Sequence, residues 1–222
     1  MIEIMDHFEN IIKNCDTHVV VFEFGTCEGL QTKQMCNILK SNKKIFKYYA
    51  FEADPRIAPH FKRNNQIHPE ITFVQAAIGN KDGNVKFYLS SGKESRPNRT
   101  QQVFYGSSSI RKPKETLIEF PDMKFETCII PSIRFDTYYE KVQPGIIDFI
   151  WADVQGAEVD LIEHGQKALS NTRYLYTEYS ESEMYEGEIN LDGIIKLLPG
   201  KWSIVENYTD GGNDVLLKNE SI

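Results

Sequence analysis

The stretch VVVFEFGTCEG, residues 19–29, decides the fold of this chain. It opens with apolar residues interrupted by a single acid, Glu23, and such short apolar runs are typical of parallel strands covered by helices on both faces. Gly25 and Gly29 follow, and glycine permits a tight turn in which backbone amides approach a ligand closely. The stretch therefore predicts a buried strand, a turn and then a helix at Leu30–Leu39.

Apolar runs of the same kind recur along the chain and predict four more strands. They are Tyr48–Phe51, Ile71–Gln75, Ile146–Ala152 and Tyr174–Thr177. Ile57–Asn65 and Glu158–Leu169 have the pattern of helices between them. Near the end, Trp202–Tyr208 and Val215–Lys218 flank TDGGND, whose Asp-Gly-Gly favours an antiparallel hairpin. We expect an α/β fold whose central sheet is parallel except for this hairpin.

The chain of 222 residues is long enough for one α/β domain, and no repeat or linker indicates a second one. Residues 1–17 should form an N-terminal amphipathic helix. One face of that helix carries Ile4, Phe8, Ile11 and Ile12. Val85–Leu89 is expected to be an additional strand after the turn signal Asp82-Gly83. Residues 90–125 are expected to be an irregular insertion near the substrate.

Composition narrows the class of protein. Hydrophobic residues make up 41% and charged residues 26%, as in ordinary globular proteins. No apolar run approaches the roughly 20 residues of a membrane-spanning helix, and the N-terminus carries acids where a secretory signal would be basic. The four cysteines include no CxxC pair, which indicates reduced thiols in a cytoplasmic protein. The formal net charge of −7 argues against general nucleic-acid binding.

Basic residues concentrate in one stretch of this acidic chain. Between Lys93 and Lys114 there is one acid, Glu94, and there are six basic residues. The basic residues are Lys93, Arg96, Arg99, Arg111, Lys112 and Lys114. The stretch is interpreted either as a solvated loop or as a patch facing an anionic acceptor, such as a phosphorylated or nucleotide-linked one.

Two acids end the first two predicted strands. Gly25 and Gly29 are spaced as GxxxG rather than as the GxGxxG of dinucleotide binders, and Glu23 at the strand end would repel a pyrophosphate. S-adenosylmethionine has no phosphate and carries an ammonium and a sulfonium, so it suits such a carboxylate. Glu52 lies 27 positions after Gly25, near where α/β nucleotide binders hold a ribose with an acid. The alternative for Glu52 is an acid near a helix start that Asp54 caps.

Two further stretches point to the same crevice. Ala76 and Ala77 end the third predicted strand with small side chains, against which a flat adenine could lie. Asp153 ends the strand before the helix opener GAEVDLIEHG, and the carboxyl ends of strands line the ligand crevice of such sheets. Asp153 is therefore expected to face the same cleft as Glu23 and Glu52. A helix cap is the alternative role for Asp153.

Together these stretches resemble the FkbM family of methyltransferases, from about Val19 to Tyr179. The more specific parts of the resemblance are FEFGTCEG, AIGNKDG, GSSSI at residues 106–110 and ADVQGAEVDLIEHG. The family's helix opener is closer to DVEGAE. Gln155 stands here in place of the first Glu of that motif, while Asp153, Gly156, Ala157 and Glu158 match.

The resemblance implies a Rossmann-like class I methyltransferase fold, S-adenosylmethionine as cofactor, and O-methylation of a sugar or another hydroxylated metabolite. It implies that the methionine part of the cofactor lies along Glu23, Gly25, Thr26 and Gly29. It places the ribose at Glu52 beside Ala53 and the adenine at Ala77. The transferred methyl would be near Ser107, Ser108 and Asp153.

A hydroxyl acceptor is a poor nucleophile, so a base or a metal should assist the transfer. Asp153 is the first candidate for the base, and Glu178 at the end of the next strand is the second. His164 is interpreted as a packed or surface residue. Two carboxylates also suit Mg²⁺ or Ca²⁺, with the acidic residues after Glu178 forming either further ligands or a solvated loop. The presence of a divalent metal stays open, as does the oligomeric state.

Two other functions fit the same residues. One is a nicotinamide-dependent oxidoreductase of the Rossmann type, against which the missing GxGxxG counts. The other is a non-catalytic module that keeps the fold and binds a nucleotide.

Overall fold

A seven-stranded sheet forms the centre of the protein in its computed structural model, which describes residues 2–92, 105–209 and 212–222. The strand order is β3-β2-β1-β7-β8-β10-β9. These strands are β1 (His18–Phe24), β2 (Ile45–Phe51), β3 (Ile71–Val74), β7 (Ile147–Ala152), β8 (Thr172–Glu178), β9 (Trp202–Tyr208) and β10 (Asp214–Asn219). The first five pair in parallel, and β10 pairs antiparallel with β8 and β9. The prediction of a parallel sheet with a C-terminal antiparallel hairpin is confirmed.

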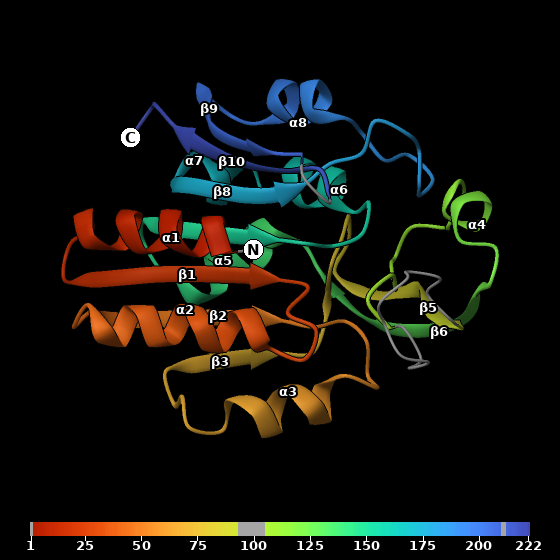
Figure 1. Cartoon of the computed structure of the whole chain (residues 1–222), viewed down its shortest axis with the longest axis horizontal. Coiled ribbons are helices and arrows are strands. Elements are labelled where there is room, and N and C mark those ends of the chain that lie inside the picture. Colours follow the sequence, from red (N-terminus) through yellow and green to blue (C-terminus); the bar gives the residue numbers. More distant parts are fainter. Residues whose placement is uncertain (1, 93–104, 210–211) are drawn as a thin grey trace.

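Helices cover both faces of this sheet (Figure 1). One face carries α1 (Ile2–Asn14), α2 (Leu30–Ser41) and α3 (Ala58–Asn65). The other face carries α5 (Phe135–Val142), α6 (Glu158–Glu163), α7 (Gln166–Ser170) and α8 (Leu191–Leu197). Two separate apolar cores result, and alternate residues of each strand enter opposite cores. In β1, for example, Val19 and Val21 pack under α1 and α2, whereas Phe22 and Phe24 pack under α5.

The predicted amphipathic helix forms as α1. Ile4, Phe8 and Ile12 are 2%, 0% and 0% exposed, and Ile11 packs at the edge of the same core. The face that they share is the one expected from the sequence.

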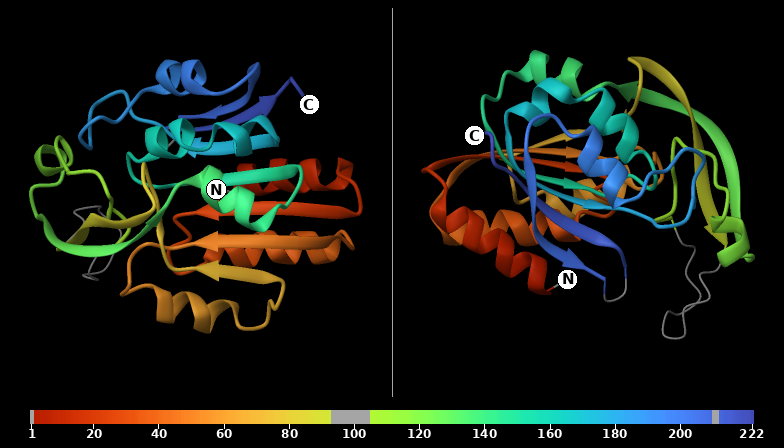
Figure 2. Two further views of the ribbon diagram at one scale, coloured as in Figure 1. Left: turned by 180° about the vertical axis from the view of Figure 1, so that it is seen from behind. Right: turned by 90° about the horizontal axis from the view of Figure 1, so that it is seen from above.

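A second, three-stranded sheet stands beyond the carboxyl ends of the parallel strands (Figures 1 and 2). It contains β4 (Ala77–Ile78), β6 (Met123–Ile133) and β5 (Gly83–Gly92) in that order, and the short helix α4 (Thr116–Glu119) lies near its outer end. The predicted strand Val85–Leu89 lies inside β5 and pairs antiparallel with β6. Because this sheet stands opposite the strand ends, it forms the far wall of the crevice.

The structure corrects one predicted element and adds others. The stretch predicted as one helix, Glu158–Leu169, is two helices, α6 and α7, which meet at Gly165. A side-chain carbon at Gly165 would lie 2.7 Å from the ring of Phe135 and 2.5 Å from a backbone oxygen, so α5 passes too close for any larger residue. Strand β6 and helices α5 and α8 were not predicted.

Within the described residues, no helix is long and apolar enough to cross a membrane.

Candidate active site

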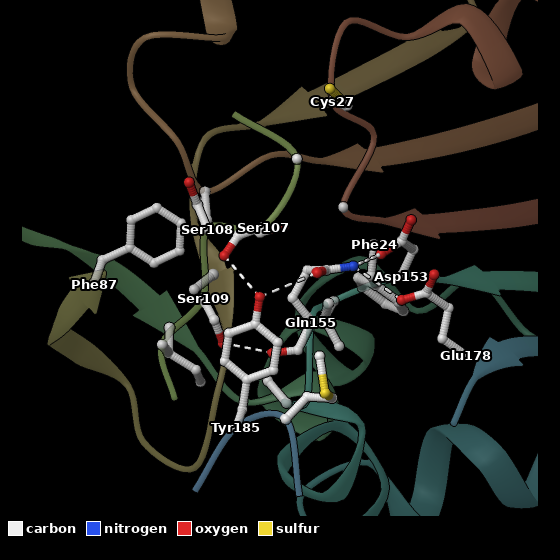
Figure 3. A pocket seen from close by; sticks show the side chains of 18 of the residues that line it. Phe24, Cys27, Phe87, Ser107, Ser108, Ser109, Asp153, Gln155, Glu178 and Tyr185 are labelled. Carbon is white, nitrogen blue, oxygen red and sulfur yellow. Dashed lines mark hydrogen bonds between the residues drawn. The ribbon is translucent and has the colours of Figure 1, made fainter. Parts of the chain in front are cut away.

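A cavity of about 450 Å³ opens where the carboxyl ends of β1, β2, β7 and β8 face the second sheet. Its walls include eight of the residues that the sequence singled out. They are Gly25, Glu52, Ala53, Ala77, Ser107, Ser108, Asp153 and Glu178. The opposite wall contains the aromatic side chains of Phe87 from the second sheet and Tyr185 from the loop after β8 (Figure 3). Tyr105, from the segment between β5 and α4, also lines it.

The turn after β1 can approach the end of β7 only because residue 25 is glycine. Gly25 has φ +83°, and a side-chain carbon built on it would lie 1.7 Å from the backbone oxygen of Asp153. The Asp153 amide donates to the Phe24 carbonyl at 2.9 Å, and the amides of Gly25 and Thr26 both donate to the Phe51 carbonyl at 3.0 Å. These contacts tie three strand ends together and set the floor of the cavity.

Glu52 lies at the end of β2 and is 7% exposed. Its two carboxylate oxygens accept backbone N–H bonds of 2.7 Å from Cys27 and from Asp54. Burial raises the pKa of Glu52 to about 7, and these two bonds oppose the rise. The carboxylate thus clamps the β1 turn to the β2 turn, and Glu52 lines the cavity together with Ala53, Ala76 and Ala77.

Glu23 does not reach this cavity, which corrects the expectation that it faces the same cleft as Glu52 and Asp153. It lies on the face of β1 that packs under α2 and is 1% exposed. Thr32 of α2 donates to its carboxylate at 2.6 Å, and the Tyr48 hydroxyl donates at 2.5 Å. Burial raises the pKa of Glu23 to about 7.

Thr26 and Gly29 also lie outside the cavity lining, although both belong to the turn that borders it. Gly29, with φ +76°, caps α2 and packs against Phe61 and Asn65 of α3. The Thr26 hydroxyl oxygen is buried and has no hydrogen-bond partner among the described residues. A buried hydroxyl without a partner is costly in free energy.

The side chains of Asp153 and Glu178 meet at the ends of β7 and β8, and the Gln155 amide bridges them (Figure 3). Its nitrogen lies 2.7 Å from Asp153 Oδ1 and 2.9 Å from Glu178 Oε2. Burial raises the pKa of both carboxyl groups, and the charge of Asp153 raises that of Glu178 further. Two adjacent buried carboxyl groups of this kind hold a proton between them at a pH where isolated ones would be ionised.

Tyr185, in the loop after β8, connects this pair to the GSSSI segment. Its hydroxyl lies 2.8 Å from the Ser107 carbonyl oxygen and 3.2 Å from Gln155 Oε1, and its ring packs on Gly156. The Ser109 hydroxyl donates to the Gln155 carbonyl at 2.7 Å. Figure 3 shows these contacts joining one wall of the cavity to the other.

The Ser108 hydroxyl serves a structural network at the cavity wall. It lies 3.2 Å from Asp54 Oδ2, 3.1 Å from the Tyr105 carbonyl and 3.3 Å from a guanidinium nitrogen of Arg56, and it accepts the Ser90 amide at 3.0 Å. Arg56 is itself bidentate on Asp54 and lies 4.5 Å over the Tyr105 ring. The network anchors the second sheet to the end of β2.

The described part of the basic stretch is paired with acids. Arg111 bonds Asp160 at 2.7 Å and Lys112 bonds Glu186 at 3.0 Å. Lys114 bonds Glu183. The other three basic residues, Lys93, Arg96 and Arg99, lie outside the described residues.

The charged side chains that line the cavity within the described ranges are all acidic. They are Glu52, Asp153, Glu178 and Glu188. A dinucleotide would bring a pyrophosphate into this lining, whereas a cationic ligand is attracted to it. Within the same ranges, no group of three or more His, Cys, Asp or Glu side chains is arranged to hold a metal ion.

Sequence reasoning missed several residues of the site. Tyr185 comes from a loop without periodic pattern, of which only the acidic residues were singled out, and Arg56 binds a partner two positions away that was interpreted as a helix cap. The signal for Gln155 was present, because it departs from the family motif. Gln155 contacts Asp153 and Glu178 at two strand ends because its backbone φ is +53°. No sequence pattern predicted this backbone conformation.

Comparison with known proteins agrees with this geometry. The Methyltransferase FkbM domain family matches residues 23–209. The chain is 33% identical over 205 residues to the 2-O-methyltransferase NoeI of Sinorhizobium fredii, which covers 91% of this chain and 80% of that protein.

Solved structures of methyltransferases share the fold. A methyltransferase FkbM from Methylobacillus flagellatus superposes with a TM-score of 0.54 at 13% identity, covering 91% of this chain and 44% of that one. Aeropyrum pernix fibrillarin in complex with S-adenosyl-L-methionine superposes with a TM-score of 0.50 at 11% identity, covering 96% and 74%. The family match and the curated relative, on a Rossmann-like sheet with an acid-lined cavity at its strand ends, show that the chain belongs to the FkbM family of S-adenosylmethionine-dependent methyltransferases.

Proposed function

We propose that this enzyme transfers the methyl group of S-adenosylmethionine to a hydroxyl of a sugar or a similar hydroxylated metabolite, with the Asp153–Glu178 pair accepting the hydroxyl proton. The observation that carries the proposal is this pair itself, two buried carboxyl groups with raised pKa at the cavity wall. A general base works best when its pKa is near the working pH, and burial brings carboxyl groups toward that range.

The residues of the first two strand ends would bind the cofactor, which supplies a methyl carbon already activated by the sulfonium. Glu52 would accept from the ribose hydroxyls, and Ala53, Ala76 and Ala77 leave room for a flat ring. Helix α2 begins at this turn with Gly29 at its N-cap, and the partial positive charge of the helix N-terminus would attract the methionine carboxylate. The Thr26 hydroxyl, which has no hydrogen-bond partner among the described residues, would donate a hydrogen bond to the cofactor at the same turn.

The acceptor would occupy the remaining part of the cavity, between Glu178 and the second sheet. That part is lined by aromatic rings and by short polar groups. Phe87, Tyr105 and Phe120 are the aromatic members, and Ser107 and Asn213 are polar ones. Such a mixture suits a sugar, whose ring has apolar faces and hydroxyl edges. The name of the relative NoeI, a 2-O-methyltransferase, supports an oxygen acceptor.

In the proposed reaction, the cavity aligns the acceptor oxygen with the methyl carbon, and this positioning supplies several kcal/mol of the barrier. The ionised member of the Asp153–Glu178 pair takes the proton that the hydroxyl loses. The carboxyl pair supplies the base for this step, so the proposal includes no metal ion. An anionic acceptor also stays a prediction, because it rests on Lys93, Arg96 and Arg99.

The test is methyl transfer from S-adenosylmethionine to pools of mono- and oligosaccharides, followed by mass spectrometry. Wild type should add one methyl group to an oxygen, and Asp153→Asn should lose most of the rate while still binding S-adenosylhomocysteine. Glu140→Gln, in an exposed ion pair with Lys167, is the control and should keep the rate. Calorimetric binding of NAD in preference to S-adenosylmethionine would support the oxidoreductase instead. Cofactor binding without transfer to any acceptor would support a non-catalytic module.

A further inference from the structure

Gln155 occupies a position that the proposed reaction does not yet use. Its amide nitrogen has two hydrogens, and the two nearest acceptors are Asp153 Oδ1 at 2.7 Å and Glu178 Oε2 at 2.9 Å. Each of these bonds is stronger when the carboxyl group is ionised. We propose that Gln155 is a positioning residue that keeps the Asp153–Glu178 pair in its proton-accepting form, an inference that rests on the proposed function for its effect on the rate.

The orientation of the amide is set by the two carboxyl groups, because only its nitrogen has two hydrogens to donate to them. Its oxygen, Oε1, lies 3.2 Å from the Tyr185 hydroxyl, whose single hydrogen is shared with the Ser107 carbonyl oxygen at 2.8 Å. The Ser109 hydroxyl holds the Gln155 carbonyl at 2.7 Å, and the backbone has φ +53°, a region that costs a non-glycine residue free energy. Strain of this kind persists where the surroundings over-determine a conformation.

The groups around the pair add negative charge or none. Asp214 comes from β10, Glu158 from α6, Tyr176 from β8, Glu23 from β1, Cys27 from the turn after β1 and Tyr185 from the loop after β8. All six side chains are carboxyl, phenol or thiol groups, and each disfavours ionisation of the pair or is neutral. No Lys, Arg or His lines the cavity within residues 2–92, 105–209 and 212–222. The two N–H groups of Gln155 are therefore the donors that offset this repulsion.

The identity of residue 155 matters for the same reason. A glutamate here, as in DVEGAE, would place a third carboxyl group against Asp153 and Glu178 and remove both N–H bonds. The pair would then retain a proton to higher pH. Glutamine has the same shape without the charge, so this chain keeps its base available at lower pH than a glutamate variant would.

The first experiment measures the protonation of the pair directly and needs no acceptor. Gln155→Met keeps the side-chain length but removes both N–H donors and adds no titrating group. Infrared spectroscopy across a pH series should show the protonated-carboxyl band persisting to a pH about 1 higher than in wild type. The difference should vanish when the same change is made in an Asp153→Asn, Glu178→Gln background, because neither carboxyl group of the pair is then left to titrate.

The matched control is Gln143→Met. Gln143 is exposed at the end of α5, and it also has a positive φ, +44°. The protonated-carboxyl band of Gln143→Met should titrate as in wild type. An unmoved band in Gln155→Met, or an equal displacement in Gln143→Met, would overturn the proposal.

The second experiment follows the rate against pH with the acceptor that the transfer assay identifies. Gln155→Glu, which fits the same space, should move the acid limb of kcat to higher pH. At a given pH on that limb, kcat should fall about tenfold if the limb moves by about one pH unit. The KM for S-adenosylmethionine should change far less.

Two results of the second experiment would count against the proposals, and they are distinguishable. An acid limb that stays in place while KM rises would assign Gln155 to cofactor binding and overturn the positioning role. If wild type transfers no methyl group at all, the proposed function fails, and the infrared titration still decides the role of Gln155.

Discussion

At the scale of single residues, Glu52 makes the most direct prediction. Its carboxylate accepts bonds from the Cys27 and Asp54 amides and belongs to the cavity lining. Glu52→Ala should weaken S-adenosylmethionine binding by roughly 1–3 kcal/mol, because a charge-assisted hydrogen-bond partner is lost. Isothermal calorimetry checks the value, with Glu140→Ala as the control on an exposed site. Equal affinity in wild type and Glu52→Ala would exclude the ribose assignment.

The positions of Glu52 and Asp153 could be predicted from the sequence, because both end parallel strands and strand ends share one edge of the sheet. Glu23 could not be placed by that rule alone. Its side chain follows Val19 and Val21 onto the α2 face, since residues two apart in a strand point the same way. The sequence shows this alternation of side chains, but it does not show which face of β1 lies closer to the cavity.

At the scale of elements, the contact between the β1 turn and the end of β7 gives a sharp test. Gly25→Ala should destabilise the fold or displace the turn, because the new carbon would collide with the Asp153 backbone oxygen. Gly145→Ala is the matched control, since Gly145 has φ +80° and nothing within 4 Å of the added carbon. Both variants carry similar backbone strain, of about 1 kcal/mol or more. Thermal unfolding should show a much larger loss for Gly25→Ala, and equal losses would contradict the collision.

Arg56 fastens the second sheet to the main sheet, so its replacement should loosen one wall of the cavity. Arg56→Lys loses the bidentate bond to Asp54 and the bonds to Ser90 and Ser108. Hydrogen exchange at residues 105–110 should become faster. The control is Arg134→Lys, in an exposed ion pair with Asp82 just beyond the ends of β6 and β5. Unchanged exchange in Arg56→Lys would show that the wall is held by other contacts.

The strands of the main sheet were predictable because helices bury both of their faces, which leaves continuous apolar runs. Strand β6 escaped prediction for the opposite reason. It is exposed along much of its length, as at Glu126 and Ile129, and it includes Pro131. Its place is set by pairing with β5, a contact between residues about 40 positions apart. Pairings of that kind are decided by the tertiary structure rather than by local pattern.

At the scale of the whole molecule, buried carboxyl groups give stability an unusual dependence on pH. Burial raises the pKa of Glu23 and Glu52 to about 7 and that of Glu158 to about 8, above the ordinary value of 4.5. The folded chain therefore binds more protons than the unfolded chain between about pH 5 and 8, and its stability falls as pH rises through this window.

Urea unfolding at pH 5.5 and pH 8 measures this effect. The free energy of unfolding should be lower at pH 8 by more than about 1.4 kcal/mol, the equivalent of a tenfold change in a proton-binding constant. Glu158→Gln keeps an acceptor for the Val154 amide and should flatten the dependence. A wild-type stability that rises over this interval would refute the assignment of these groups as buried acids in the folded state.

The acid-only lining of the described cavity also bears on turnover. In the proposed reaction the cofactor changes from a sulfonium cation to an uncharged thioether, while the Asp153–Glu178 pair gains the proton of the acceptor hydroxyl. Ligand and lining therefore lose opposite charges in the same step, so the cavity and its contents have the same net charge before and after methyl transfer.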